Sequence, residues 1–213
     1  LRGRDQMHTA EDRMHAACVT IVLPPRPQDG AAPRRLEITL DRGRTYRLVV
    51  PEAGRRQAIV NQLDASGIAA LVPAAGRLIA NLKVWENIVL PLAYHGGTSM
   101  PELESRATAL FGELGYSPGQ VRDLALQHPD RLGALERRLV AFVRAMLAEP
   151  EVLVLDSVVD GLTRSEAARA LALGTLYLRR FPFRTVVHIE PEPADSAEWI
   201  DRKSTRLNSS HIT

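Results

Sequence analysis

The sequence lacks the features that would place it outside the cell or within a membrane. Cys18 is the only cysteine among the 213 residues, so no internal disulfide can form. No run approaches the ~18 to 20 apolar residues that a membrane-spanning helix needs. The first residues lack the apolar core of a signal peptide, and because the first of them is not Met, we expect a fragment of a longer chain. We therefore expect a cytoplasmic protein that does not insert directly into a membrane.

The chain also lacks a strong charge of either sign. Its formal net charge is +2, but three basic residues lie in residues 202–213, and 24 basic and 25 acidic residues remain without them. That stretch has no periodic apolar pattern, and we expect it to be a non-native tail; a flexible native tail is the alternative. This charge balance predicts that nucleic acid is not a partner.

Hydrophobic residues make up 45% of the chain and charged residues 24%, which is typical of a globular domain. Residues 1–17 show no clear pattern. Apolar, β-rich runs predict strands, and turn residues separate them. The strands are predicted at residues 18–23, 36–40, 46–50 and 68–72, with a helix from about 55 to 63.

The second half of the chain alternates helices and strands. Capping boxes predict helix starts after Ser99 and after Thr163. Leucines at helical spacing predict a further helix between them, from Leu132 onwards, and unbroken apolar runs predict central parallel strands at residues 152–155 and 185–189. This order favours an α/β layered domain, with a helical lobe at about residues 92–130.

One long stretch resembles a known family. The residues from Leu132 to Asp156 resemble, without a gap, the signature helix and Walker B strand of ABC transporter ATPases, with Arg144, Pro150 and Asp156 at the family's positions. Upstream, Val84-Trp85-Glu86-Asn87 resembles the stretch that leads from the family's Q-loop into its helical subdomain. The resemblance covers about residues 36–201.

The resemblance implies an α/β fold of the P-loop NTPase type with a small helical subdomain. It places the domain at residues 18–201 and the subdomain at about 92–130. The N-terminal β-region is expected to be reduced, because a segment that usually forms antiparallel strands is absent between Asn61 and Val72. The implied cofactors are ATP and Mg²⁺. The implied partners are a membrane permease and a second ATP-binding subunit, identical or different, which would hold the chain at the periphery of the inner membrane.

The family's phosphate-binding loop is replaced in this chain. Such a loop needs glycines that let backbone N–H groups curl around phosphate, a Lys, and a hydroxyl that holds Mg²⁺. The equivalent residues that could contact nucleotide are Gly54, Arg55, Arg56 and Gln57. Arg55 replaces a glycine, Arg56 keeps a positive charge at the Lys position, and Gln57 lacks the hydroxyl. The two arginines either bind phosphate weakly or are ordinary solvated charges.

Other positions that contact nucleotide in the family are also replaced. Ala74 stands at the Q-loop Gln position, and Gly133 at the signature Ser position. Ser157 stands at the position of the catalytic Glu, and a Ser of ordinary acidity cannot take a proton from water. Glu190 fits the place of the switch His, while His188 lies two residues early. Leu135 puts a large side chain where the family has a glycine that approaches the partner's ATP.

Asp156 at the end of a buried strand either still binds Mg²⁺ or remains as a residue that holds the turn. Asp156, Ser157 and His188 do not predict a hydrolase, because no Gly-x-Ser-x-Gly elbow is present. His8 and His15 have no partner at metal-ligand spacing.

The function indicated is an ATP-binding subunit of an ABC transporter that is impaired or inactive in ATP hydrolysis. A stand-alone binding or regulatory protein with the same fold is the alternative, and an ordinary active ATPase would require several motifs to be misaligned. Residues 84–94 are a hypothetical permease-docking surface, although they would equally pack the junction of two lobes. The residues concerned are Trp85, Ile88, Leu90, Leu92 and Tyr94.

Overall fold

A five-stranded sheet forms the centre of this computed structural model, which describes residues 17–23, 34–95, 98–191 and 204–207. The strand order is β4-β5-β6-β3-β7, and all four pairings are parallel. The inner strands read as apolar runs because helices cover both faces of the sheet. The strands are β3 (Thr45–Val49), β4 (Ala69–Pro73), β5 (Val152–Asp156), β6 (Thr185–Glu190) and β7 (Ser204–Leu207).

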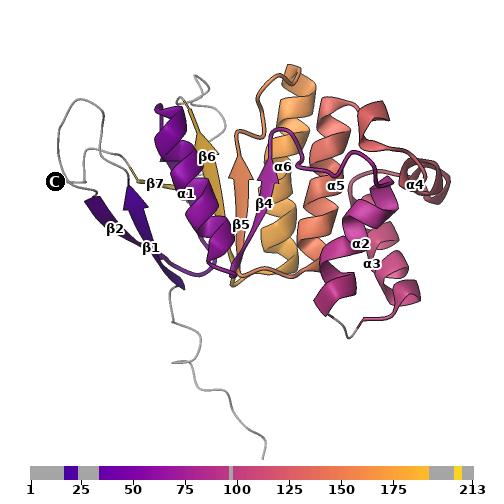
Figure 1. Ribbon diagram of the computed structural model, residues 1–213, viewed down its shortest axis with the longest axis horizontal. Helices are drawn as coiled ribbons and strands as arrows, with labels where there is room; N and C mark the ends of the chain where they lie inside the picture. The colour runs from indigo at the N-terminus through magenta and orange to yellow at the C-terminus, as the bar shows by residue number, and fades with distance from the viewer. Residues whose placement is uncertain (1–16, 24–33, 96–97, 192–203, 208–213) are drawn as a thin grey trace, which may run out of the picture.

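Two further strands form a separate antiparallel sheet. Strands β1 (Ala17–Leu23) and β2 (Arg34–Leu40) pair with Ala17 opposite Leu40. β1 lies against helix α1 (Ala53–Ala65), on the side of the molecule away from α2–α4 (Figure 1).

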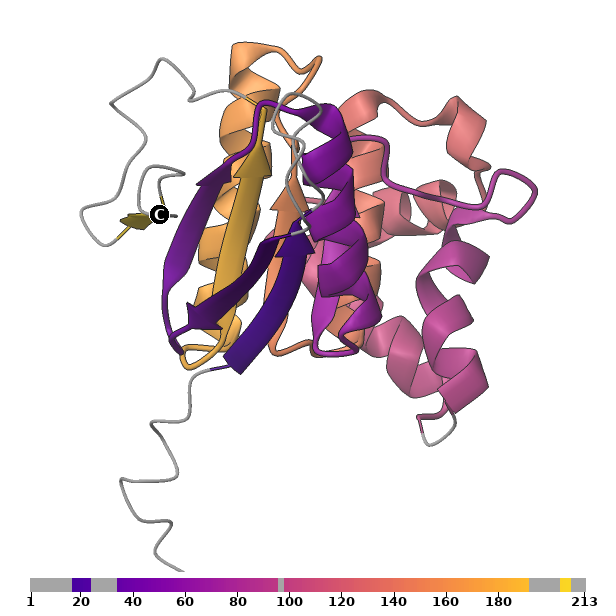
Figure 2. The ribbon, with the colours of Figure 1, turned by 60° about the vertical axis from the view of Figure 1, so that its left-hand side comes forward.

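The central sheet lies between two helical layers. Helix α1 covers one face, and α5 (Ala134–Leu147) and α6 (Arg164–Arg180) cover the other (Figure 2). Each layer encloses its own apolar core, and burial of these apolar surfaces is the main force that holds the layers together. On the α1 side the core includes Tyr46, Leu48, Ile59, Val60 and Leu63.

A helical lobe packs beside α5. It contains α2 (Val84–His95), α3 (Met100–Glu113), α4 (Pro118–Ala125) and the short 3₁₀ helix η2 (Pro129–Arg131). The Ser99 hydroxyl accepts a hydrogen bond from the Glu102 N–H at the start of α3, and Thr163 forms a full capping box with Glu166 at the start of α6. None of the described helices is both long and apolar enough to cross a membrane.

The predicted α/β class and the parallel sheet are confirmed. Residues 66–68 alone connect α1 to β4, which agrees with the reduced β-region. Residues 204–207, within the stretch expected to be non-native, form β7 beside β3, while the origin of that stretch stays a prediction. The limits of the domain and of the helical subdomain also stay predictions. His8 and His15 lie outside the described residues.

Candidate functional site

Strands β3, β4, β5 and β6 end at one edge of the central sheet. We call it the carboxyl edge, and it comprises the strand ends with the residues that follow them: 50–57, 73–74, 156–157 and 190. The Val50 N–H donates to the Glu190 carbonyl (2.8 Å), and the Ala74 N–H donates to the Asp156 carbonyl (2.9 Å). The Ser157 N–H donates to the Ile189 carbonyl (2.9 Å). These bonds bring most of the predicted site residues together, at the edge where open α/β sheets bind ligands.

Residues 50–57 form a helix start rather than a loop around phosphate. The prediction placed the helix from about Arg55, but α1 begins at Ala53, and the Arg56 N–H already donates to the Glu52 carbonyl (2.9 Å). None of residues 50–57 has a positive φ. Gly54 is an ordinary helical residue with open space where a Cβ would stand. The chain therefore passes from strand to helix without the curl of N–H groups that binds phosphate.

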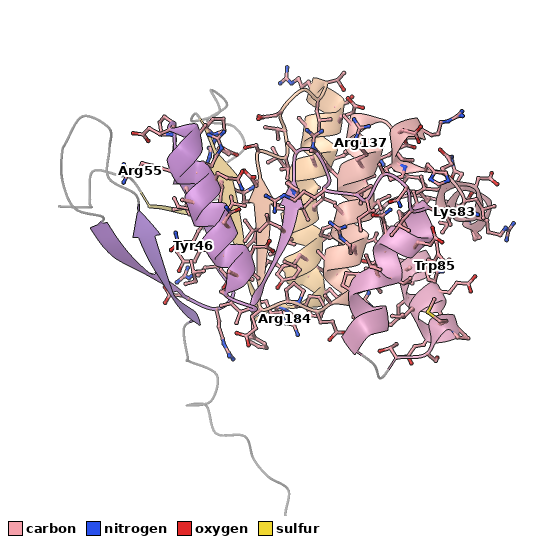
Figure 3. All side chains as sticks on the ribbon, viewed as in Figure 1. Tyr46, Arg55, Lys83, Trp85, Arg137 and Arg184 are labelled. Atoms are coloured by element: carbon pink, nitrogen blue, oxygen red, sulfur yellow. The ribbon has the colours of Figure 1, made fainter. Side chains whose placement is uncertain are left out.

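The side chains at this helix start already have partners within the chain. The Arg56 guanidinium donates to the Val50 carbonyl (3.1 Å), and the Gln57 amide donates to Asn61 one turn along the helix (2.7 Å). Arg55 is half-buried, and Figure 3 labels it near α1. Glu52, at the N-cap, adds negative charge where phosphate would need positive charge.

Asp156 is half-buried at the end of β5. Burial raises the pKa of its carboxyl group, while the Ser157 hydroxyl, which donates to Oδ1 (3.1 Å), and the charges of Arg56 and Arg77 act in the opposite direction on that pKa. Among the described residues, no group of three or more His, Cys, Asp or Glu could hold a metal ion. A cation at Asp156 would also have to compete with the nearby Arg56 guanidinium. The residues present therefore do not fit a Mg²⁺–triphosphate in the family's manner.

Ser157 is buried and adopts the left-handed backbone conformation with φ +51°. His188 lies inside β6 as predicted, with Nε2 3.4 Å from the place where a Cβ on Gly174 of α6 would stand. Burial lowers the pKa of His188 to about 4. Among the described residues Ser157 and His188 share no hydrogen bond, so the two do not form the nucleophile–base pair of a hydrolase.

Glu190 is buried at the end of β6. Its carboxylate accepts a hydrogen bond from the Arg47 Nε (2.6 Å) and forms an ion pair with the same guanidinium. The side chain at the predicted switch position is therefore held by β3. Sequence analysis missed this partner because Arg47 lies 143 residues away along the chain.

Ala74 opens a turn that is fixed to α5. Gly76 has φ +75°, and a Cβ there would lie 2.8 Å from the Arg137 carbonyl oxygen. The Arg144 guanidinium donates to the carbonyls of Gly76 (3.2 Å) and Arg77 (3.1 Å), and burial lowers its pKa. Arg144 thus holds the turn that follows the predicted Q-loop position.

Gly133 lies apart from the carboxyl edge's strands, at the N-cap of α5, where its N–H donates to the Glu136 carboxylate (2.9 Å). Leu135 is buried in the core, where α5 turns its side chain inward; its correspondence to the family's glycine stays a prediction. Arg138 was not singled out from the sequence. It is buried, and its Nη2 donates to the Asp160 carbonyl.

The Val-x-Glu-Asn motif builds the junction between α2 and the turn before it. The Glu86 carboxylate accepts from the Lys83 N–H (2.6 Å). The Asn87 amide accepts from the Ile79 N–H (2.6 Å) and donates to the carbonyls of Ile79, Leu82 and Lys83 (3.0, 3.1 and 3.1 Å). Asn87 is 1% exposed, so these four bonds satisfy backbone groups that water does not reach.

The predicted docking residues differ in their burial. Ile88 is 1% exposed and belongs to the core, so its assignment to a docking surface is wrong. Trp85 and Leu92 are partly buried against the same core. Leu90 is half-buried, and the side chain of Tyr94 lies outside the described residues.

Comparison with known proteins gives relatives of one kind. No family model matches the chain. It is 29% identical over 136 residues to the methionine import ATP-binding protein MetN 2 of Pseudomonas aeruginosa, a match that covers 60% of this chain and 39% of that protein. It is 31% identical over 96 residues to MetN 1 of Pseudomonas putida, covering 45% of this chain and 27% of that protein. The matches thus span well under half the length of these relatives.

Solved structures share the fold. The dimeric structure of a bacterial ABC transporter cassette superposes with a TM-score of 0.62 at 17% identity, covering 84% of this chain and 88% of that one. The structure of cbiO1 from Clostridium perfringens, part of the ABC transporter complex cbiONQ, gives 0.60 at 13% identity, covering 81% and 77%.

Proposed function

Because the chain belongs to the ABC ATP-binding family, we propose that it is a transporter-associated ATP-binding subunit with an impaired nucleotide site. In this role it pairs with a second ATP-binding subunit, identical or different, and reaches the inner membrane through a permease. The observation that carries the proposal is the direct passage from β3 into α1, without a residue of positive φ in residues 50–57. A triphosphate would meet a helix end there instead of a cradle.

Ser157 supplies the second reason for low activity. A missing general base typically costs ~10²- to 10⁴-fold in rate, and its hydroxyl is already hydrogen-bonded to Asp156. We expect no measurable Mg²⁺-dependent ATP hydrolysis by the purified chain.

The variant Ser157→Glu tests this reason separately. It should not restore hydrolysis, because a base is of no use without a positioned substrate. Ser157 is also buried, so the variant's fold must be checked by its far-UV circular dichroism. Robust hydrolysis by the folded variant, abolished by Asp156→Asn, would show that the nucleotide site is intact and overturn the proposal.

A permease would dock beside the start of α2. Exposed apolar side chains occur there at Ile79 (42% exposed) and Leu126 (66% exposed), next to the partly buried Trp85. Two contacts hold these residues near one another: Asn87 bonds to the backbone of Ile79, and the Val84 N–H donates to the Gln127 carbonyl (2.8 Å). A small apolar patch rimmed by polar groups suits a helix that lies in a groove.

Co-purification with a co-expressed ABC transporter permease tests docking. We expect Ile79→Asp and Leu126→Asp to abolish capture, because each places a charge in the patch. Phe183→Asp is the matched control, since Phe183 is 64% exposed at the other end of the sheet. If the parent chain captures no permease, or if all three variants bind like the parent, the docking proposal is wrong, and a stand-alone regulatory protein becomes the better interpretation.

A further inference from the structure

A second site lies at the end of the sheet opposite the carboxyl edge. A cavity of about 260 Å³ opens where β5 and β6 begin. Figure 3 shows Arg184 at this end of the molecule, and Arg55 and Arg137 at the other. The cavity is lined by Arg42, Glu151, Phe183, Arg184 and Thr185.

Backbone contacts fix the shape of this cavity. The Gly43 N–H donates to the Arg184 carbonyl (3.0 Å), and the Thr185 hydroxyl donates to the Asp41 carbonyl (2.8 Å). Gly43 has φ +69°, and a Cβ there would lie 3.0 Å from the Pro182 carbonyl oxygen. The turn that carries Arg42 is therefore held tightly against the start of β6.

Arg184 is fixed as well. Its Nη1 donates to the Pro150 carbonyl (2.9 Å), and its guanidinium carbon lies 4.1 Å from the centre of the Phe181 ring. An arginine held on both sides loses little conformational freedom when it binds a ligand.

The charges of the lining are not neutralised by one another. Within the described part of the chain, neither Arg42 nor Glu151 lies within ion-pair distance of an opposite charge. The cavity thus offers two guanidinium groups and one carboxylate, next to the largely exposed ring of Phe183. Guanidinium groups favour a carboxylate ligand, whereas Glu151 opposes a polyanion and favours an ammonium group.

We propose that this cavity binds a free α-amino acid with an apolar side chain. Its carboxylate lies between Arg42 and Arg184, its ammonium group faces Glu151, and its side chain rests on Phe183. The volume supports this class, because about 260 Å³ is below the ~300–1,000 Å³ typical of sites for drug-sized ligands. The site does not depend on the carboxyl edge or on nucleotide.

Three probes of similar size test the zwitterion: L-phenylalanine, 3-phenylpropionate without the ammonium group, and phenethylamine without the carboxylate. Binding to the full chain is followed by ¹⁵N–¹H NMR titration. We expect L-phenylalanine to bind with a dissociation constant on the order of 1 mM and to shift the amides of residues 42–43 and 183–185. Each of the other probes should bind at least about fivefold more weakly, because each lacks one charged contact.

Two variants assign the charges. Arg42→Met should weaken L-phenylalanine about tenfold, and Glu151→Gln should remove the preference over 3-phenylpropionate. Arg122→Met and Glu104→Gln are the controls, because both residues are exposed and lie on α4 and α3, away from the cavity's lining. The proposal is overturned if L-phenylalanine shifts no amide at the cavity, if the three probes bind equally, or if Arg42→Met binds like Arg122→Met.

Discussion

The carboxyl edge differs from the junction at which residues 76–83 meet both α2 and α5. At the junction, Asn87 and Arg144 match the family's pattern, and both hold backbone groups in place. At the carboxyl edge, Ser157 and Glu190 depart from the pattern, and both have partners inside the chain. We infer that the residues kept are those that build the fold, whereas the predicted replacements fall at positions whose role in the family is contact with ATP.

The largest expected effect concerns the replaced edge. Arg47→Met leaves the buried Glu190 carboxylate without its partner, which should destabilise the chain by about 3–5 kcal/mol. Arg180→Met is the matched control, because the Arg180–Glu113 pair is exposed and should contribute no more than about 1 kcal/mol. Urea unfolding measures both. Equal losses in the two variants would show that Glu190 is not held by a buried pair.

The retained junction should depend strongly on Asn87. Asn87→Ala removes four hydrogen bonds and leaves buried backbone groups unsatisfied, so we expect a loss of about 3 kcal/mol. Asn61→Ala is the control, because Asn61 is exposed and bonds only to Gln57; it should change stability by less than about 0.5 kcal/mol. A cost near zero for Asn87→Ala would remove the structural explanation of the Val-x-Glu-Asn motif.

The stability of the folded chain should depend on pH through His188, which lies in β6. Its pKa is about 4 in the folded chain and 6.5 when unperturbed, so the unfolded chain binds the extra proton between these values. The free energy of unfolding should therefore have its full value above pH 6.5 and decrease by up to about 3 kcal/mol as the pH falls towards 4. Urea unfolding of His188→Gln across this range should show a flatter profile, while the exposed His128→Gln keeps the parent's slope. Parallel profiles for His188→Gln and the parent would contradict the prediction.

The smallest expected effect is a gain in stability. Burial raises the pKa of Asp156, so the folded chain favours its ionised form less than the unfolded chain does. Asp156→Asn keeps a hydrogen-bond acceptor for Ser157 and should stabilise the chain by at most about 1 kcal/mol at pH 7. The exposed Asp123→Asn should show no gain in the same thermal melts. A marked loss of stability in Asp156→Asn would mean that the ionised carboxylate has a structural role.

The sequence patterns predicted helices and strands more accurately than they predicted which side chains contact one another. The leucine spacing from Leu132 onwards and the capping box at Thr163 depend on local geometry, and both helices are present in the structure. Whether Ile88 lies on a docking surface or packs a lobe junction was left open by the sequence, because its burial depends on which face of a helix meets the rest of the fold. The replacements at residues 54–57 stay predictions from the sequence, whereas the direct passage from β3 into α1 is visible only in the backbone.

A titration of the purified chain with MgATP at low and high salt measures whether the carboxyl edge still holds nucleotide. We expect only weak binding that falls steeply with salt, because Arg55, Arg56 and the first N–H groups of α1 are the phosphate partners that remain. Asp156→Asn should leave that binding unchanged. Tight, Mg²⁺-dependent binding that resists salt and is lost in Asp156→Asn would show that the carboxyl edge still holds nucleotide, and the account of this edge would be wrong.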